Sequence, residues 1–339
     1  MKPLAITALP TRKCNLNCQY CKIKNNNFPN ELNWEQWIVG LEKLYRQFDS
    51  LCFTCLLGGD ITVWKDDLVK FVKGMSSTGI FYSFTTNGLL LTENFLKKLK
   101  ENGLDSISVS LDSLKLRKDK FEYIKSQKTL VLLDLLNKLG FKELHCTITV
   151  DKINLTELPE IVRFLTKNKV VSEITPLIFG KTKAYDYASS REDLKDRILT
   201  TRDKYQVDEI MSKLVEMKRQ GYLIHNTDNY LLNWSRYGIK QQWKCRYPIK
   251  LVLDADGTMR LCLHIKGDLV TRHNISNLNF KTFLRDWRKD FKKLCHGCYW
   301  NCQYEPKYIY EKTKDFKSVI NYFNHRVKYA EKKIKKSKT

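Results

Sequence analysis

The sequence has no apolar run that approaches the roughly 20 residues of a membrane-spanning helix. Its first ten residues hold no apolar segment long enough for the core of a secretory signal. Acidic residues are also scarce, since 37 Asp and Glu stand against 60 Lys and Arg in 339 residues. The lack of a long apolar run and of a signal core argues against a membrane-spanning or secreted protein. Together with the eleven cysteines, it predicts a chain of the reducing cytoplasm.

The formal charge of +23 favours anionic partners such as nucleic acid, phosphorylated metabolites or acidic peptides. Much of the lysine, however, falls at 96–100, at 115–120 and in the tail 332–338. Lysine on helix faces and in tails is usually explained by exposure to solvent. The charge therefore leaves both a surface for anionic partners and ordinary solvated faces open.

Three of the eleven cysteines stand on one short stretch, Cys14-x3-Cys18-x2-Cys21, with Tyr20 before the last. In a reducing compartment, cysteines are more often metal ligands than disulfides. Three thiolates can hold three irons of a 4Fe-4S cubane and leave the fourth iron open to an exogenous ligand. The alternatives are a zinc knuckle, which usually has four ligands in closely spaced pairs, or three unrelated buried thiols.

Apolar runs alternate with stretches of helical periodicity, which is the pattern of βα units around a parallel sheet. The expected strands are 4–9, 51–57, 80–85, 106–111, 144–150 and 173–179, and the expected helices are 34–48, 66–75, 93–102, 125–139 and 158–167. Six strands cannot close an eight-stranded barrel. The fold class predicted is α/β, a partial (β/α)6 TIM-like barrel followed by a small cysteine-rich domain, with active residues at the carboxyl ends of strands.

The cysteine stretch resembles the signature of the radical S-adenosylmethionine (SAM) enzymes. In that family the open iron binds the amine and carboxylate of SAM, and an electron from the cluster cleaves SAM to methionine and a 5′-deoxyadenosyl radical. The resemblance extends over residues 4–179. It implies a 4Fe-4S cluster on Cys14, Cys18 and Cys21, with Tyr20 beside the cofactor and an electron donor such as flavodoxin or ferredoxin.

Two motifs at expected strand ends resemble SAM-binding elements of that family. Gly58-Gly59-Asp60 is similar to its Gly-Gly-Glu element, whose backbone and acid hold the amino group of SAM. Asp60 is one methylene shorter than the usual Glu. Thr86-Asn87 lies in a Thr-Asn-Gly sequence often found after the third strand, although an Asn-Gly turn explains it equally well.

Two further strand ends carry polar side chains that resemble family contacts. Ser110 and Asp112 should share a face because the side-chain period of a strand is two, and they resemble the Ser-x-Asp that contacts the ribose or carboxylate of SAM. Thr149, near the end of the fifth strand, is a weaker cofactor candidate.

A second cysteine set, Cys245, Cys262, Cys295, Cys298 and Cys302, follows around an expected hairpin at 249–263. Its spacing is similar to the opening of the SPASM and twitch domains of radical SAM enzymes, which hold auxiliary 4Fe-4S clusters. Full SPASM domains carry seven such cysteines and this chain has five, so its second set resembles the single-cluster twitch form more closely. Whether Cys298 or Cys302 completes the shell stays open, as does a structural zinc site.

The other cysteines and histidines are expected to have lesser roles. Cys52, Cys55 and Cys146 lie in strand segments and are interpreted as small buried hydrophobes. His264 and His296 are expected beside ligands or on the surface. The predicted units are the barrel at 1–180, a helical bridge at 181–244 with its clearest helix at 192–219, the cluster domain at 245–302 and a basic helical tail at 303–339.

The function that these features favour is a radical SAM oxidoreductase that takes hydrogen from a peptide side chain. A dehydrogenase of a sugar or alcohol intermediate is the first alternative, and a zinc-stabilised nucleic-acid-binding protein is the alternative from another class. The signature begins at residue 14, which leaves no room for the N-terminal leader-binding domain that some peptide maturases carry. No side chain is predicted as a catalytic base.

Overall fold

The computed structural model describes residues 3–115, 120–180, 189–190, 192–245, 250–260, 262–263, 273–295, 297–315, 317–319 and 321–322. The positions of His264 and His296, and most of the predicted basic tail, lie outside these ranges.

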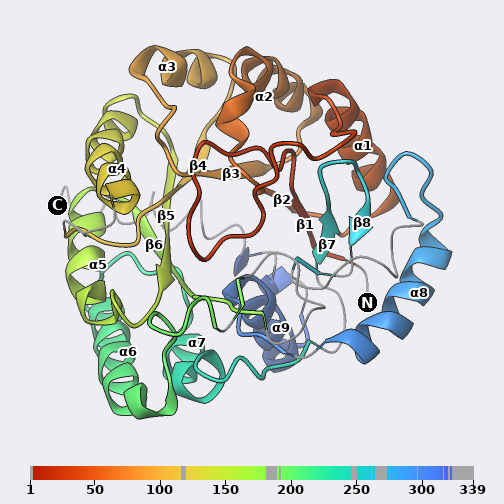
Figure 1. The fold of residues 1–339 in the computed structure, drawn as a ribbon. Coiled ribbons are helices and arrows are strands. Elements are labelled where there is room, and N and C mark those ends of the chain that lie inside the picture. Colours follow the sequence, from red (N-terminus) through yellow and green to blue (C-terminus); the bar gives the residue numbers. More distant parts are fainter. Residues whose placement is uncertain are drawn as a thin grey trace.

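An open sheet of parallel strands forms the centre of the fold (Figure 1). Its six predicted strands are β1 (Ala5–Ala8), β2 (Phe53–Leu56), β3 (Tyr82–Thr86), β4 (Ser106–Ser110), β5 (Glu143–Val150) and β6 (Val171–Pro176). The strand order β6-β5-β4-β3-β2-β1-β7-β8 does not close on itself. This confirms the predicted partial barrel, although β6 begins two residues before its predicted start.

The hairpin of the second cysteine region completes the sheet. Strand β7 (Lys250–Leu253) pairs in parallel with β1, and β8 (Met259–Arg260) pairs antiparallel with β7. The segment 245–302 therefore shares a sheet with the barrel that precedes it in the chain.

Helices surround the sheet, and α1 to α6 lie on its outer side (Figure 1). The helices are α1 (Trp34–Gln47), α2 (Asp66–Thr78), α3 (Glu93–Glu101), α4 (Lys120–Lys138), α5 (Leu158–Lys167), α6 (Lys204–Arg219), α7 (Asp228–Leu232), α8 (Phe280–Leu294) and α9 (Asn301–Thr313). In the part of the chain that is described, none of them has the length and apolar character needed to cross a bilayer.

The bridge helix predicted over 192–219 begins only at Lys204, after a 3-10 turn at Thr201–Asp203. Thr200 caps that turn, because its hydroxyl oxygen accepts from the backbone N–H of Arg202 at 3.3 Å. The Thr200 backbone N–H in turn donates to the carboxylate of Asp203 at 2.7 Å, as in a capping box. Residues 192–200 instead fold back on the barrel, where Leu194 and Ile198 are buried.

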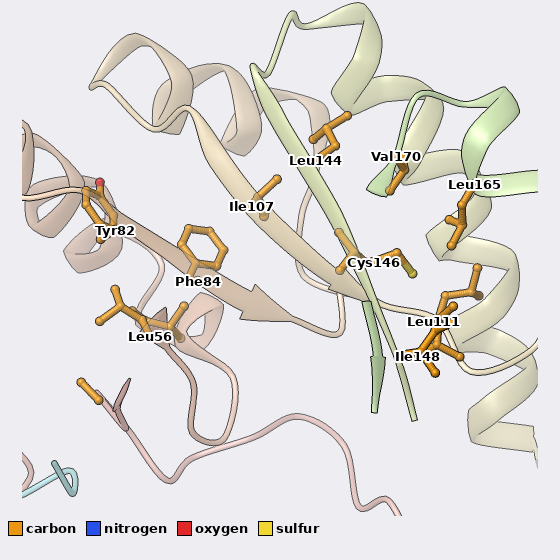
Figure 2. Close-up of a cluster of buried hydrophobic side chains, with 14 of the residues drawn as sticks. Leu56, Tyr82, Phe84, Ile107, Leu111, Leu144, Cys146, Ile148, Leu165 and Val170 are labelled. Atoms are coloured by element: carbon orange, nitrogen blue, oxygen red, sulfur yellow. The ribbon is translucent and has the colours of Figure 1, made fainter. Parts of the chain in front are cut away.

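Side chains alternate between the two faces of the sheet. Leu144, Cys146 and Ile148 of β5 lie with Ile107 and Leu165 in the main core between sheet and helices (Figure 2). This burial of Cys146 matches the predicted apolar role, and Cys52 and Cys55 are half-buried in a smaller apolar cluster.

The other face of the sheet is more polar and is covered by helix α9, which lies within the ring of outer helices (Figure 1). Ser108 and Thr147 on neighbouring strands share a hydrogen bond of 3.1 Å between their hydroxyl oxygens. Asn301 at the start of α9 donates to the carboxylate of Glu173 on β6 at 2.6 Å. Helix α9 thus covers part of the inner face of the sheet. The carboxyl ends of the strands face the cysteine loop.

Candidate active site

The loop that carries the first three cysteines leaves β1 and is held by the turn after β2. The backbone N–H groups of Gly59 and Asp60 donate to the carbonyls of Thr11 and Lys13, both at 2.8 Å. A Cβ atom at Gly59 would lie 2.0 Å from the carbonyl oxygen of Lys13. Glycine is required here because the cysteine loop approaches the turn too closely for any side chain.

Cys14, Cys18 and Cys21 are all half-buried on this loop. Burial raises the pKa of the Cys14 thiol, and the carboxylate of Asp60 and the Cys21 sulfur add to the rise. A bound metal would offset this effect, since metals bind the thiolate form. The Cys14 thiol therefore favours the thiolate form only when a cation is bound.

Within the described ranges, no three His, Cys, Asp or Glu side chains lie close enough together to hold a single metal ion. A cubane cluster needs a wider arrangement, because each thiolate binds a different iron. Three half-buried thiols on one loop fit such a cluster better than a zinc ion, which usually has four protein ligands.

Asp60 is 1% exposed, and its carboxylate connects the segments that follow β2 and β3. It accepts hydrogen bonds from the backbone N–H and hydroxyl of Thr62 at 3.0 and 2.6 Å, from the hydroxyl of Thr86 at 3.0 and 2.9 Å, and from the N–H of Asn87 at 2.8 Å. Asp60 and Thr86 thus bind each other. Contact of the Gly58–Asp60 backbone and of Asn87 with SAM stays a prediction.

Asp60→Ala is expected to lower the free energy of unfolding by at least about 3 kcal/mol, because it leaves four donors without their acceptor and each such buried donor costs about 1–3 kcal/mol. Thermal unfolding of the metal-free protein should show the loss as a lower melting temperature. The exposed Glu101→Ala is the matched control. Equal melting temperatures would show that the four donors find other acceptors.

Asp112 connects the cysteine loop to the fifth strand. The Tyr20 hydroxyl donates to one of its carboxylate oxygens at 2.9 Å, and the backbone N–H of Thr149 donates to the other at 2.9 Å. Burial, with the Asp112 charge next in size, raises the pKa of Tyr20 well above its usual value, so the phenol stays protonated as a donor. Ser110 ends β4 opposite Thr147 and is half-buried.

An apolar pocket of about 160 Å³ lies beside these groups. Its lining includes Tyr20, Cys21 and Thr149, and also Leu263 and Trp300. It thus lies between the first cysteine loop and the segments that carry Cys262 and Cys302.

Thr175 is a pocket residue that the sequence did not single out. It pairs with Thr149 in the register of β5 and β6 and is 6% exposed. Its hydroxyl oxygen is buried and has no hydrogen-bond partner among the described residues. A buried hydroxyl of this kind on a pocket wall is suited to bind a polar atom of a ligand. The only available signal was its place within the strand predicted at 173–179.

The five cysteines of the second set come together beside helix α9. Burial raises the pKa of Cys245 well above its usual value, and the nearby sulfurs of Cys298, Cys262 and Cys295 add to the rise in that order. Burial likewise raises the pKa of Cys298, whose neighbours include Cys262, Cys295 and Cys302. The fold therefore gathers cysteines that are up to 57 positions apart in the sequence, from Cys245 to Cys302.

A buried charge network joins the two cysteine regions. The Arg12 guanidinium binds both carboxylate oxygens of Asp254, at 2.9 and 2.6 Å, and Arg260 binds one of them at 2.7 Å. Arg12 lies two residues before Cys14, and Arg260 two residues before Cys262. One carboxylate thus fixes both loops relative to each other, because a buried ion pair holds its members in a narrow geometry.

A larger cavity of about 460 Å³ opens at the opposite ends of the strands, lined by residues that include Val171, Lys218, His225 and Tyr322. Val171 is the first residue of β6, whereas Thr175 and Pro176 close that strand at the cysteine side. The candidate cluster and cofactor residues Tyr20, Cys21 and Thr149 therefore line the smaller pocket and not the larger cavity.

Comparison with known proteins agrees with this geometry. Residues 9–165 match the Radical SAM superfamily. The Fe-coproporphyrin III synthase of Methanosarcina barkeri is 32% identical over 179 residues, which are 50% of this chain and 42% of that protein. A probable GTP 3′,8-cyclase of Methanococcus aeolicus is 26% identical over 281 residues, 80% of this chain and 88% of that protein.

Two solved structures share the fold over most of the chain. The structure of anSMEcpe with bound AdoMet and the Cp18Cys peptide has a TM-score of 0.61 at 18% identity and covers 97% of this chain and 99% of that one. Streptococcus suis SuiB bound to the precursor peptide SuiA has a TM-score of 0.62 at 16% identity, covering 84% of this chain and 65% of SuiB. The match covers the open parallel barrel and the three cysteines after β1, so residues 9–165 of this chain are a domain of the radical SAM superfamily.

Proposed function

We propose that this protein is a radical SAM oxidoreductase of the reducing cytoplasm that oxidises a peptide side chain with the help of a second 4Fe-4S cluster. The observation that carries the proposal is the place of the pocket. Its lining includes Cys21 of the first cysteine loop together with Leu263 and Trp300, which are neighbours of the second cysteine set in the sequence. A substrate carbon in this pocket would lie between two cysteine sites.

The first cluster would be held by Cys14, Cys18 and Cys21, and when bound it would supply the electron that cleaves SAM. Tyr20, Thr149 and Thr175 line the same pocket as Cys21 and are suited to hold the adenosyl group. Its ring would fill apolar space, and its hydroxyls would have the Thr175 hydroxyl as a partner. The chain's own task is to direct the reaction at one C–H bond and to exclude water.

The second cluster would be held by Cys245, Cys262, Cys295 and one of Cys298 or Cys302. Removal of a hydrogen atom leaves the substrate one electron short of the parent. Release of a proton to solvent and of one further electron to the second cluster would complete a two-electron oxidation. A zinc ion at these cysteines could hold the fold but could not accept that electron.

A peptide is the favoured substrate because the likeness to anSMEcpe extends through the second cysteine region, with 97% of this chain covered. A peptide-sized groove is not required, since only one side chain must enter the pocket of about 160 Å³. The family also favours an enzyme over the nucleic-acid-binding alternative, which depended on net charge alone.

A small anionic metabolite is the second candidate, because a probable GTP 3′,8-cyclase aligns over 80% of this chain. The formal charge of +23 suits either an anionic nucleotide or an acidic peptide.

The two candidates are separated by the effect of each substrate on SAM cleavage. Reconstituted protein with SAM and dithionite should form 5′-deoxyadenosine faster when a peptide encoded beside its gene is added, and the peptide should lose two mass units. GTP is the comparison substrate. Stimulation by GTP with none by the peptide would replace the peptide proposal with the metabolite one.

Asp112→Ala is expected to weaken SAM binding by about 1.5 to 3 kcal/mol, the cost of losing a hydrogen bond to a charged group. Its loss would free Tyr20 and the Thr149 backbone, which both donate to this carboxylate. Calorimetry with SAM measures the change, and iron content should stay near that of the wild type. The exposed Asp134→Ala serves as control. Unchanged affinity would restrict Asp112 to a structural role.

A further inference from the structure

The ring of Tyr20 is enclosed by a segment that lies far away in the sequence. It packs against Leu177 and Phe179, which follow β6, and against Leu194 and Ile198 from the stretch before α6. The Tyr20 hydroxyl is already bound to Asp112. With the hydroxyl fixed, rotation of the Tyr20 ring is limited by the side chain that packs on its face.

Arg197 lies over that face. Its guanidinium carbon is 5.4 Å from the centre of the Tyr20 ring, a cation–π distance. The same guanidinium donates to a carboxylate oxygen of Asp151 through Nε at 2.7 Å and through a terminal nitrogen at 2.6 Å. Asp151 is 1% exposed and Arg197 is 7% exposed, so the pair is poorly screened by solvent.

The segment around Arg197 also holds the backbone of the cysteine loop. The Ser189 hydroxyl donates to the carbonyl of Gln19 at 2.6 Å, and the Gln19 side chain donates to the carbonyl of Asp193 at 3.2 Å. The carbonyl of Arg197 in turn accepts from the N–H of Lys152 at 2.8 Å, next to Asp151. Arg197 is thus fixed at both its backbone and its head group.

We propose that Arg197, held by Asp151, is the positioning residue that keeps the Tyr20 ring in place as a wall of the pocket and thereby sets the affinity for the adenosyl half of SAM. This rests on the proposed place of the adenosyl group beside Tyr20 and Thr175, and not on the identity of the substrate. Arg197 does not line the pocket, so it acts through the tyrosine ring.

The test uses reconstituted wild-type and Arg197→Gln protein and two halves of the cofactor. Binding of 5′-deoxyadenosine is measured by calorimetry, and methionine is followed by its effect on the electron paramagnetic resonance signal of the reduced cluster. Arg197→Gln is expected to weaken 5′-deoxyadenosine about tenfold, the size of a partly buried cation–π contact. Iron content and the methionine response should not change.

Three variants control this result. Arg197→Lys keeps a cation and should recover part of the affinity, and the exposed Arg202→Gln should bind as the wild type does. The double variant Asp151→Asn with Arg197→Gln leaves no unpaired buried charge, so it guards against loss of folding. It should show the same tenfold effect, because the amide oxygen that replaces the Asp151 carboxylate could still accept the N–H bonds of Ile153 and Asn154.

Wild-type affinity for 5′-deoxyadenosine in iron-loaded Arg197→Gln protein would overturn the proposal. An equal loss of the methionine response would also overturn it, since the whole loop would then have moved. Thr175→Val separates this inference from the placement of the adenosyl group. If Thr175→Val weakens 5′-deoxyadenosine and Arg197→Gln does not, only the role of Arg197 fails, and if neither does, the pocket assignment fails with it.

Discussion

Cys18→Ala protein is expected to form no 5′-deoxyadenosine above background when it is reconstituted anaerobically and supplied with SAM and dithionite. The substitution removes one of only three thiols on the loop after β1. A cluster with two protein ligands is not held in the orientation that leaves one iron open, and SAM has no defined site to chelate. The wild type should form the product under the same conditions, measured by chromatography.

Cys52→Ala is the matched control, because Cys52 is also half-buried but lies at the start of β2, where its thiol donates to the carbonyl of Leu4 at 3.2 Å. This variant should keep the iron and the product of the wild type. Equal product from the wild type and Cys18→Ala would show that SAM cleavage does not depend on this loop.

The sequence predicted the barrel well because its signals are local. Strand and helix periodicity depends on neighbours within a few positions. The caps found in the structure, Asn33 on α1 and Thr92 on α3, are just as local. The motif of Cys14, Cys18 and Cys21 is equally local, since one short loop carries all of it. Helix α5 has the predicted limits of 158–167.

The parts that the sequence could not predict depend on contacts between distant residues. Asp60 resembles a cofactor acid, but its carboxylate is occupied by Thr62, Thr86 and Asn87. Thr175 has no motif around it and becomes a pocket residue only through the register of β5 with β6. Arg197 lies in a stretch predicted as helix, and its contact with Tyr20 spans 177 positions of the chain.

Spacing left open whether Cys298 or Cys302 completes the second site, and one of them has more support. The pKa of Cys245 is raised by burial and then by Cys298, Cys262 and Cys295, and Cys302 acts in the same way on Cys298. Cys298 is buried and its backbone N–H is fixed by the carbonyl of Trp243 at 2.9 Å, two residues before Cys245. We therefore expect Cys298 to be the fourth ligand of the second cluster and Cys302 to be the thiol left over.

Iron analysis tests this expectation in a background where Cys14, Cys18 and Cys21 are all replaced by Ala, so that only the second site can bind iron. That protein should carry about four irons per chain, one 4Fe-4S cluster. Adding Cys298→Ala leaves three of the four proposed ligands and should lower the iron below four per chain, whereas Cys302→Ala should leave about four. Both changes remove a thiol from the segment 298–302, so each is the control for the other.

A loss of iron with Cys302→Ala and its retention with Cys298→Ala would reverse the assignment. Zinc in place of iron in the background protein would remove the electron acceptor, because zinc has no second oxidation state to offer. The barrel and its first cluster would stand in that case, but the reaction would have to end without the transfer of a second electron to the protein. The metal bound by these cysteines therefore decides between a two-electron oxidation and a simple hydrogen abstraction.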